Sequence, residues 1–269
     1  MPTASCNGVA LYHEVHGDGE PLLCVMGLAT DTLAWALQVP AWSAEYRTII
    51  FDNRDVGRSG YVEEEYVVAD MARAALALAD HLGLDSFHLL GMSMGGMIAQ
   101  EMALAAPERV RTLQLVVTLG GSGRWGRERA RLWLKDAAGR TREDMIDELL
   151  LLCLSERSFE NRDLVTFLRN AMLANPNPQR PGGFARQLAA TTRHETRDRL
   201  GRLEMPVHVI GAGHDVLVPV WKSRELAALI PGAELTVLEG AAHGCNLERA
   251  EEFNRAVLDW LRARAAYSA

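Results

Sequence analysis

The sequence predicts an α/β fold built on a mainly parallel sheet, with an inserted helical segment. Short apolar runs alternate with stretches of helical periodicity, several of those runs are apolar throughout, and one long interval contains no such run. Strands that are apolar on both faces are typical of a parallel sheet covered by helices. The chain has 269 residues, 48% of them apolar and 23% charged, which is typical of a globular protein with a sizeable core.

Seven runs are candidates for strands. Residues 8–16 are expected to form a first strand, antiparallel to its neighbour. The other six runs are short and mostly apolar, as buried parallel strands are. They cover residues 21–26, 47–52, 87–90, 111–118, 206–212 and 233–238.

Four stretches between these runs have apolar residues at helical spacing. They cover residues 67–82, 94–105, 222–230 and 249–264. The first three stop next to Gly83, Pro107 and Pro231, residues that are frequent just after helices. Strands and helices therefore alternate, as they do in a fold with a parallel sheet.

The interval at residues 119–205 has no strong strand candidate. It is far longer than an ordinary crossover, which needs only about a dozen residues. It contains helical patterns at 143–154 and 164–173, and a loop rich in proline and asparagine at 175–183. We interpret 119–205 as a helical cap over the carboxyl edge of the sheet. Residues 1–118 and 206–269 then form the core.

Charge and cysteine content exclude several classes of protein. The net charge of −7 argues against a nucleic-acid partner, because proteins that bind the negatively charged phosphate backbone usually carry an excess of basic residues. The four cysteines are scattered, without metal-ligand spacing, so no metal site is expected. The N-terminus lacks a basic segment followed by an apolar one, and no apolar run reaches about 18 residues. We therefore expect a cytoplasmic protein without a signal peptide or membrane span.

Residues 91–95 (GMSMG) match the G-x-S-x-G pattern of a nucleophile elbow. The pattern alone is weak, but here an expected strand precedes it and an expected helix follows. A serine in so sharp a turn needs small neighbours, which Gly91, Gly95 and Gly96 supply. This context predicts Ser93 as a catalytic nucleophile. The alternative is a glycine-rich turn without chemistry.

A serine hydroxyl needs a base to take its proton, and His243 is the best candidate among eight histidines. It follows the last expected strand, where sites of α/β proteins gather. His88 and His208 lie inside expected strands and are interpreted as core residues. The remaining histidines lie on the first strand, at a helix end, in the cap or beside the acid: His13, His16, His81, His194 and His214.

The base in turn needs a carboxylate to orient it, and Asp215 is the candidate. It follows the expected strand at 206–212. The other possible place is the end of the strand near Thr118, but no Asp or Glu occurs near it. The alternative for Asp215 is an aspartate that stabilises its own turn.

An oxyanion hole requires backbone N–H groups that face the developing negative charge. Met94 directly follows the nucleophile and should supply one donor. The loop after the strand at 21–26 should supply the other, and we assign it to Leu28. Gly27 would let this loop approach the substrate.

The chain order Ser93, Asp215, His243 resembles the α/β-hydrolase superfamily, in its esterase and lipase-like branch. Residues 51–59 (FDNRDVGRS) resemble the family's D-x-R-G-x-G-x-S loop, with Asp55 in place of the usual glycine. Met26-Gly27 stands where the family commonly has His-Gly. A similar Met-Gly pair is found in esterases that resemble the aclacinomycin methylesterases. The resemblance implies an eight-stranded, mainly parallel sheet and a serine hydrolase without cofactor.

The resemblance also disfavours some branches. Haloalkane dehalogenases and epoxide hydrolases use an aspartate nucleophile, and carbon–carbon hydrolases often have Asn where Met92 stands. Among the aromatic residues, Trp125 and Trp35 are the candidates for substrate contact. Trp125 follows a glycine-rich loop, and Trp35 follows the oxyanion loop. Other cap residues are interpreted as the cap's own small core: Trp133, Phe159, Phe167 and Met172.

The leading hypothesis is an enzyme that hydrolyses small to medium neutral carboxylic esters through an acyl-enzyme. The same triad would also serve an enol-lactonase, a methylesterase for a secondary metabolite, or a cofactor-free perhydrolase. A ligand sensor without turnover is a further hypothesis from another class. The sequence distinguishes neither these substrates nor the oligomeric state.

Overall fold

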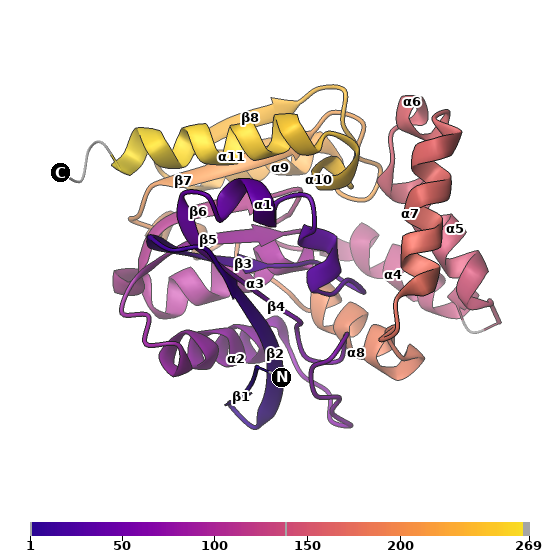
Figure 1. Ribbon diagram of the computed structural model, residues 1–269, viewed down its shortest axis with the longest axis horizontal. Helices are drawn as coiled ribbons and strands as arrows, with labels where there is room; N and C mark the ends of the chain where they lie inside the picture. The colour runs from indigo at the N-terminus through magenta and orange to yellow at the C-terminus, as the bar shows by residue number, and fades with distance from the viewer. Residues whose placement is uncertain (1, 138, 266–269) are drawn as a thin grey trace.

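The computed structural model describes residues 2–137 and 139–265, and its centre is one eight-stranded sheet (Figure 1). The strand order is β1-β2-β4-β3-β5-β6-β7-β8. The strands are β1 Thr3–Cys6, β2 Val9–His16, β3 Glu20–Val25, β4 Tyr46–Phe51, β5 Phe87–Met92, β6 Val110–Val116, β7 Val207–Ala212 and β8 Glu234–Leu238.

All pairings from β4 to β8 are parallel, whereas β1–β2 and β2–β4 are antiparallel. This confirms the predicted α/β class and the eight-stranded, mainly parallel sheet. The sequence analysis missed β1, a four-residue strand. It forms a hairpin with β2 through Asn7 and Gly8, which both have positive φ angles (48° and 81°), as a tight two-residue hairpin turn requires.

Helices cover both faces of the sheet. On one face lie α2 (Val68–His81), α3 (Met94–Ala105) and α9 (Val220–Leu229), whose buried side chains join one large core cluster. On the other lie α1 (Val39–Trp42), α10 (Cys245–Glu248) and α11 (Ala250–Ala265), which contribute to a second cluster. Figure 1 shows α11 above the sheet and α2 below it. Short 3₁₀ helices complete the core: η1 Thr32–Trp35, η2 Pro107–Arg109 and η3 Leu200–Arg202.

Among the described residues, five α-helices lie between β6 and β7, and we call them the helical insertion. They are α4 Gly123–Ala137, α5 Arg142–Cys153, α6 Glu156–Phe159, α7 Arg162–Ala174 and α8 Pro181–Thr192. Within the described part of this interval the only β pairing is an isolated bridge between Gly121 and Glu195. Figure 1 shows α5, α6 and α7 standing to one side of the sheet.

The insertion differs from the expectation in three helices. No helix was expected at α4, α6 or α8, and α8 begins within the interval 175–183, which was expected to be a loop. Pro181 opens α8, a position that suits proline because the first helical N–H groups have no partner within the helix. No helix within the described ranges is both long and apolar enough to cross a membrane.

Candidate active site

Ser93 occupies a strained turn between β5 and α3. Its φ of 56° is rare for a residue with a side chain, and such strain is concentrated at functional sites. A Cβ atom on Gly95 would lie 2.0 Å from the Val25 carbonyl oxygen, and one on Gly91 would lie 2.3 Å from the Gly95 carbonyl oxygen. The glycines therefore permit the close packing that holds Ser93 at the end of the strand.

Three side chains from distant parts of the chain form one hydrogen-bonded series. His243 Nε2 lies 2.9 Å from Ser93 Oγ, and His243 Nδ1 lies 2.8 Å from Asp215 Oδ2. Asp215 and His243 follow β7 and β8, and their exposed fractions are only 4% and 8%. The structure thus brings together the three residues predicted as nucleophile, base and acid.

The other oxygen of Asp215 fixes the carboxylate in place. Asp215 Oδ1 accepts hydrogen bonds from the backbone N–H groups of Leu217 and Val218, both at 2.8 Å. With Oδ1 engaged by the backbone, Oδ2 is left to face the imidazole. Asp215 therefore stabilises its own turn and contacts His243 at the same time.

The loop after β3 lies directly against Ser93. A Cβ atom on Gly27 would lie 3.1 Å from the Ser93 Cβ and 3.6 Å from its Oγ. Within the part of the chain that the structure describes, the Leu28 and Met94 N–H groups donate no hydrogen bond. Both predicted oxyanion donors are thus unpaired, and each is next in sequence to a residue of this contact: Leu28 follows Gly27, and Met94 follows Ser93.

The segment at residues 51–59 organises this neighbourhood. Asn53 Nδ2 donates to the Met26 carbonyl oxygen at 2.9 Å. Asp52 is fully buried and accepts from the N–H groups of Thr32 and Arg58, both at 2.8 Å. Burial raises the pKa of Asp52, and these backbone hydrogen bonds oppose the shift. Asp52 thus holds loops together rather than facing the serine.

The helical insertion makes hydrogen bonds beside the acid and the base. Gly244, next to His243, donates its N–H to the Cys153 carbonyl oxygen at 2.7 Å. The carboxylate of Glu248 accepts from Ala242 N and from both Ser155 N and Oγ.

Arg129 of α4 contacts the loop after β7, which carries Asp215 and which we call the acid loop. Its guanidinium donates to the Leu217 carbonyl oxygen at 2.6 Å and to that of Val216 at 3.3 Å. The sequence analysis missed both Glu248 and Arg129. Their partners are mainly backbone groups, which leave no pattern in the sequence.

The two tryptophans expected to contact substrate differ in their exposure. Trp35 is fully buried and packs against Trp42, with ring centroids 5.4 Å apart. It has no surface to offer a ligand, so the expectation for Trp35 is corrected. Trp125 is 58% exposed and lies under the Arg129 guanidinium, 4.5 Å from it. Trp125 thus sits at the surface of the insertion, beside a residue that contacts the acid loop.

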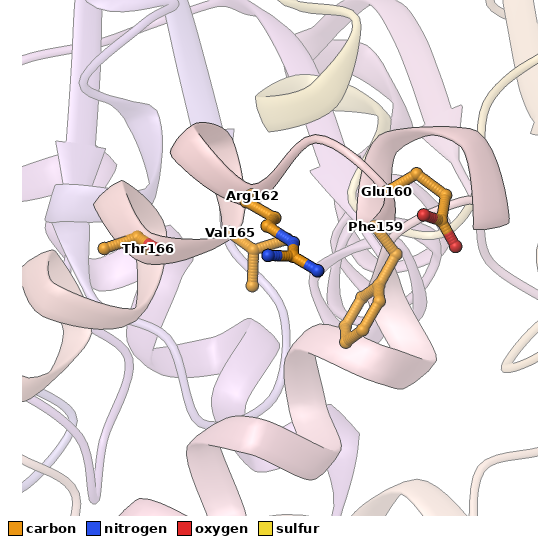
Figure 2. Close-up of a pocket in the computed structure, with 5 residues that line it drawn as sticks. All are labelled: Phe159, Glu160, Arg162, Val165 and Thr166. Atoms are coloured by element: carbon orange, nitrogen blue, oxygen red, sulfur yellow. The ribbon is translucent and has the colours of Figure 1, made fainter.

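Two cavities lie at the insertion. One, of about 450 Å³, is lined by α5 and α6 and by His214 and Val216, which flank Asp215. The other, of about 340 Å³, is lined by side chains of α7 and the end of α6 and contains no triad residue (Figure 2). Figure 2 shows the Arg162 side chain extending toward the ring of Phe159, with Val165 and Thr166 on the other side of Arg162.

His88 in β5 and His208 in β7 are buried and partnered, as expected. His88 contacts Thr112 at 2.8 Å and Glu20 at 3.0 Å, and His208 contacts Thr236 at 2.8 Å. Burial lowers the pKa of both rings, that of His208 to about 4. They are neutral core residues at neutral pH, remote in role from the triad.

Comparisons with known proteins agree with this geometry. The family model described as the alpha/beta hydrolase fold matches residues 20–250. A protein of Azorhizobium caulinodans, named as a candidate carbamate hydrolase, RutD, is 29% identical over 96% of this chain and 97% of its own.

Two solved structures are similar over nearly the full chain. The enol-lactonase from Burkholderia xenovorans LB400 has a TM-score of 0.85 at 25% identity, covering 97% of this chain and 100% of its own. A thermophilic esterase from Thermogutta terrifontis, solved with malate bound, has a TM-score of 0.85 at 26% identity, covering 95% and 94%. The chain therefore belongs to the α/β hydrolase fold family of hydrolases.

Proposed function

We propose that this protein is a serine hydrolase that cleaves carboxylic esters through an acyl-enzyme. The observation that carries the proposal is the unbroken series from Asp215 through His243 to Ser93, with contacts of 2.8 and 2.9 Å. A base within hydrogen-bond reach of a nucleophile, itself oriented by a carboxylate, is the arrangement that activates a hydroxyl. The unpaired N–H groups of Leu28 and Met94 support the proposal as candidate oxyanion donors.

Each group has a defined part in the reaction. Ser93 Oγ attacks the ester carbonyl carbon while His243 Nε2 takes the serine proton, and Asp215 stabilises the resulting imidazolium. The Leu28 and Met94 N–H groups bind the oxyanion of the tetrahedral intermediate. When the intermediate collapses, His243 gives its proton to the departing alcohol, which leaves an acyl-serine. Water then attacks this ester, with His243 as its base, and releases the acid and the free serine.

The surroundings of the oxyanion loop favour apolar, uncharged acyl groups. Leu28 and Ala29 pack against a small apolar cluster of the insertion that contains Phe184, Leu188 and Trp133. Burial of hydrocarbon against such apolar side chains is favourable by about 25 cal/mol of free energy per Å² of apolar surface. The same side chains provide no opposite charge for an ionic group. Small to medium neutral esters are therefore the proposed substrates.

The test is hydrolysis of p-nitrophenyl esters from acetate to decanoate by the wild type and by Ser93→Ala. We expect turnover by the wild type, with a chain-length optimum that measures the pocket, and loss of turnover in the variant. Circular dichroism and the melting temperature check that the variant is folded. Turnover that survives in Ser93→Ala, or a wild type inactive on every ester, would contradict the proposal.

A second candidate is hydrolysis of an enol-lactone, which is a cyclic ester. The similarity to the Burkholderia xenovorans enol-lactonase over the whole chain favours it. The mechanism is the same, except that the leaving enolate stays attached to the acyl chain. The test compares kcat/KM on enol-lactones, on linear esters and on a simple carbamate. The class with the highest value distinguishes an enol-lactonase from a linear esterase and from a carbamate hydrolase, the activity in the name of the RutD relative.

A further inference from the structure

Gln187 of α8 links the helical insertion to the oxyanion loop. Its side chain is fully buried, although glutamine is usually exposed. Its Oε1 accepts from the Ala29 N–H at 3.2 Å, and its Nε2 donates to the Arg54 carbonyl oxygen at 2.7 Å. Gln179 donates a further bond to the same Oε1 at 2.9 Å. One amide of the insertion thus bridges the loop after β3 and the segment at 51–59.

The backbone that Gln187 holds is strained. Ala29 has a φ of 63°, a left-handed conformation that costs a residue with a Cβ about 1 kcal/mol or more. Such a conformation persists only where its surroundings hold it. Ala29 directly follows Leu28, so the hydrogen bond to Gln187 fixes the peptide next to the proposed oxyanion donor.

The neighbouring residue fastens α8 to the same place. Arg186 forms a two-pronged ion pair with Asp55, at 2.8 and 3.0 Å, and the Asp55 side chain is fully buried. A Cβ atom on Gly183 would lie 2.5 Å from the Asp55 carbonyl oxygen, so the first turn of α8 lies directly against this loop. The aspartate at this position, where the resemblance led us to expect glycine, is therefore a docking point for α8.

We infer that Gln187 is a positioning residue for the oxyanion hole, because through the Ala29 N–H it sets the direction of the Leu28 N–H. The ion pair between Asp55 and Arg186 keeps α8, and therefore Gln187, in place against the loop. The inference rests on the proposed function. Gln187 touches no reacting atom, and its effect passes through the loop backbone. The insertion thus supports the candidate catalytic site through a buried side chain.

The inference makes a specific kinetic prediction. An oxyanion donor acts on charge that exists only in the transition state, so its displacement lowers kcat and leaves KM nearly unchanged. Removing such a donor outright typically costs about 10²–10³ in rate. Loss of its support should cost less, so we expect Gln187→Met to lower kcat by about 10-fold or more.

The experiment measures kcat and KM with p-nitrophenyl butyrate for the wild type, Gln187→Met and Arg193→Met. Arg193 caps the same helix and ties it to the core through Glu65 and the Tyr66 carbonyl, away from the oxyanion loop. We expect a lower kcat at constant KM in Gln187→Met alone. The inhibition constant of a trifluoromethyl ketone, which forms a tetrahedral adduct with the serine, should rise by the same factor as kcat falls.

Three results would overturn the inference: an unchanged kcat in Gln187→Met, an increase in KM as its main effect, or an equal loss in Arg193→Met. If Gln187→Met does not fold, Gln187→Glu takes its place. This variant keeps the acceptor for Ala29 and loses the donor to Arg54, so we expect a smaller fall in kcat, again at constant KM. Wild-type turnover that depends on Ser93 establishes the proposed function independently, so the two failures are distinguishable.

Discussion

The sheet and the helical insertion are built in opposite ways, although both reach the active site. The sheet carries two large clusters in which side chains such as Leu89 and Ile210 are fully buried. The insertion has two small clusters, and apolar side chains such as Leu151 and Phe167 are 60% and 64% exposed. The insertion thus lacks a core of comparable size.

This difference suggests that the sheet and the helical insertion contribute differently to stability and to the positions of the catalytic loops. The sheet supplies the serine, acid and base at strand ends, where tight packing fixes them. The insertion attaches to these loops by polar contacts: Arg129 at the acid loop, Cys153 and Ser155 near the base, and Gln187 at the oxyanion loop. Stability is therefore expected to reside in the sheet, and control of the catalytic loops in the insertion.

The largest expected effect concerns chemistry at the sheet edge. Asp215→Asn keeps an oxygen for the Leu217 and Val218 N–H groups but no longer provides a carboxylate for His243. We expect kcat to fall by about 10⁴-fold with little change in melting temperature, because the imidazole loses its orientation and its counter-charge. Ester hydrolysis and thermal unfolding measure the two effects. A loss below about tenfold would mean that another group orients the base.

A truncation in each region tests where the stability resides. Leu89→Ala in β5 should lower the free energy of unfolding by about 4 kcal/mol, because the rigid surroundings leave a cavity. Leu168→Ala in α7 should cost about 2 kcal/mol, because the thin cluster around it can collapse. Urea denaturation measures both values. Equal losses would contradict the proposed difference between the two regions.

Acid should weaken both regions through buried histidines. Burial lowers the pKa of His208 in β7 and of His194 after α8 to about 4 each, from 6.5 in an unfolded chain. Each ring stays neutral in the fold but binds a proton on unfolding, so stability is lost as pH falls from about 6.5 to 4. Each contributes up to about 3 kcal/mol to this loss.

The variants His194→Asn and His208→Asn separate the two contributions. Each should reduce the difference in unfolding free energy between pH 7 and pH 4, because an amide does not titrate in this range. Denaturant unfolding at both pH values measures it. If neither variant alters the dependence on pH, the buried rings are not its source.

The smallest effect is expected on the outer surface of the insertion. Phe167 was expected in the core of the insertion, but its side chain is 64% exposed, so that expectation is corrected. Phe167→Ser in α7 should therefore change the free energy of unfolding by less than about 0.5 kcal/mol. Catalysis on short esters should also stay the same. A loss of several-fold in kcat would place this exposed face in contact with the catalytic loops.

The sequence alone sufficed to predict most of the sheet, and it placed Ser93, Asp215 and His243 next to strand ends, where the structure brings them together. Local patterns account for the predicted elements: apolar runs identify buried strands, and α3 spans the predicted residues 94–105. The serine, acid and base each lie next to a strand end, so their positions followed once the strands were recognised. The strand β1, which has only four residues, and the helices α4 and α8 were missed. The helix α4 is rich in arginine, and α8 begins with Pro-Gly-Gly, a sequence more typical of a loop.

Tertiary structure alone decided how these residues meet. Trp35 was expected at the substrate, but the packing of η1 against α1 buries it beside Trp42. The contact between Ala29 and Gln187 joins positions 158 residues apart, and one partner is a backbone N–H. Every residue has such a group, so no sequence pattern marks the one that is used. Residue type and the local spacing of apolar residues can be taken directly from the sequence. The choice of a backbone hydrogen-bond partner depends instead on which segments fold side by side.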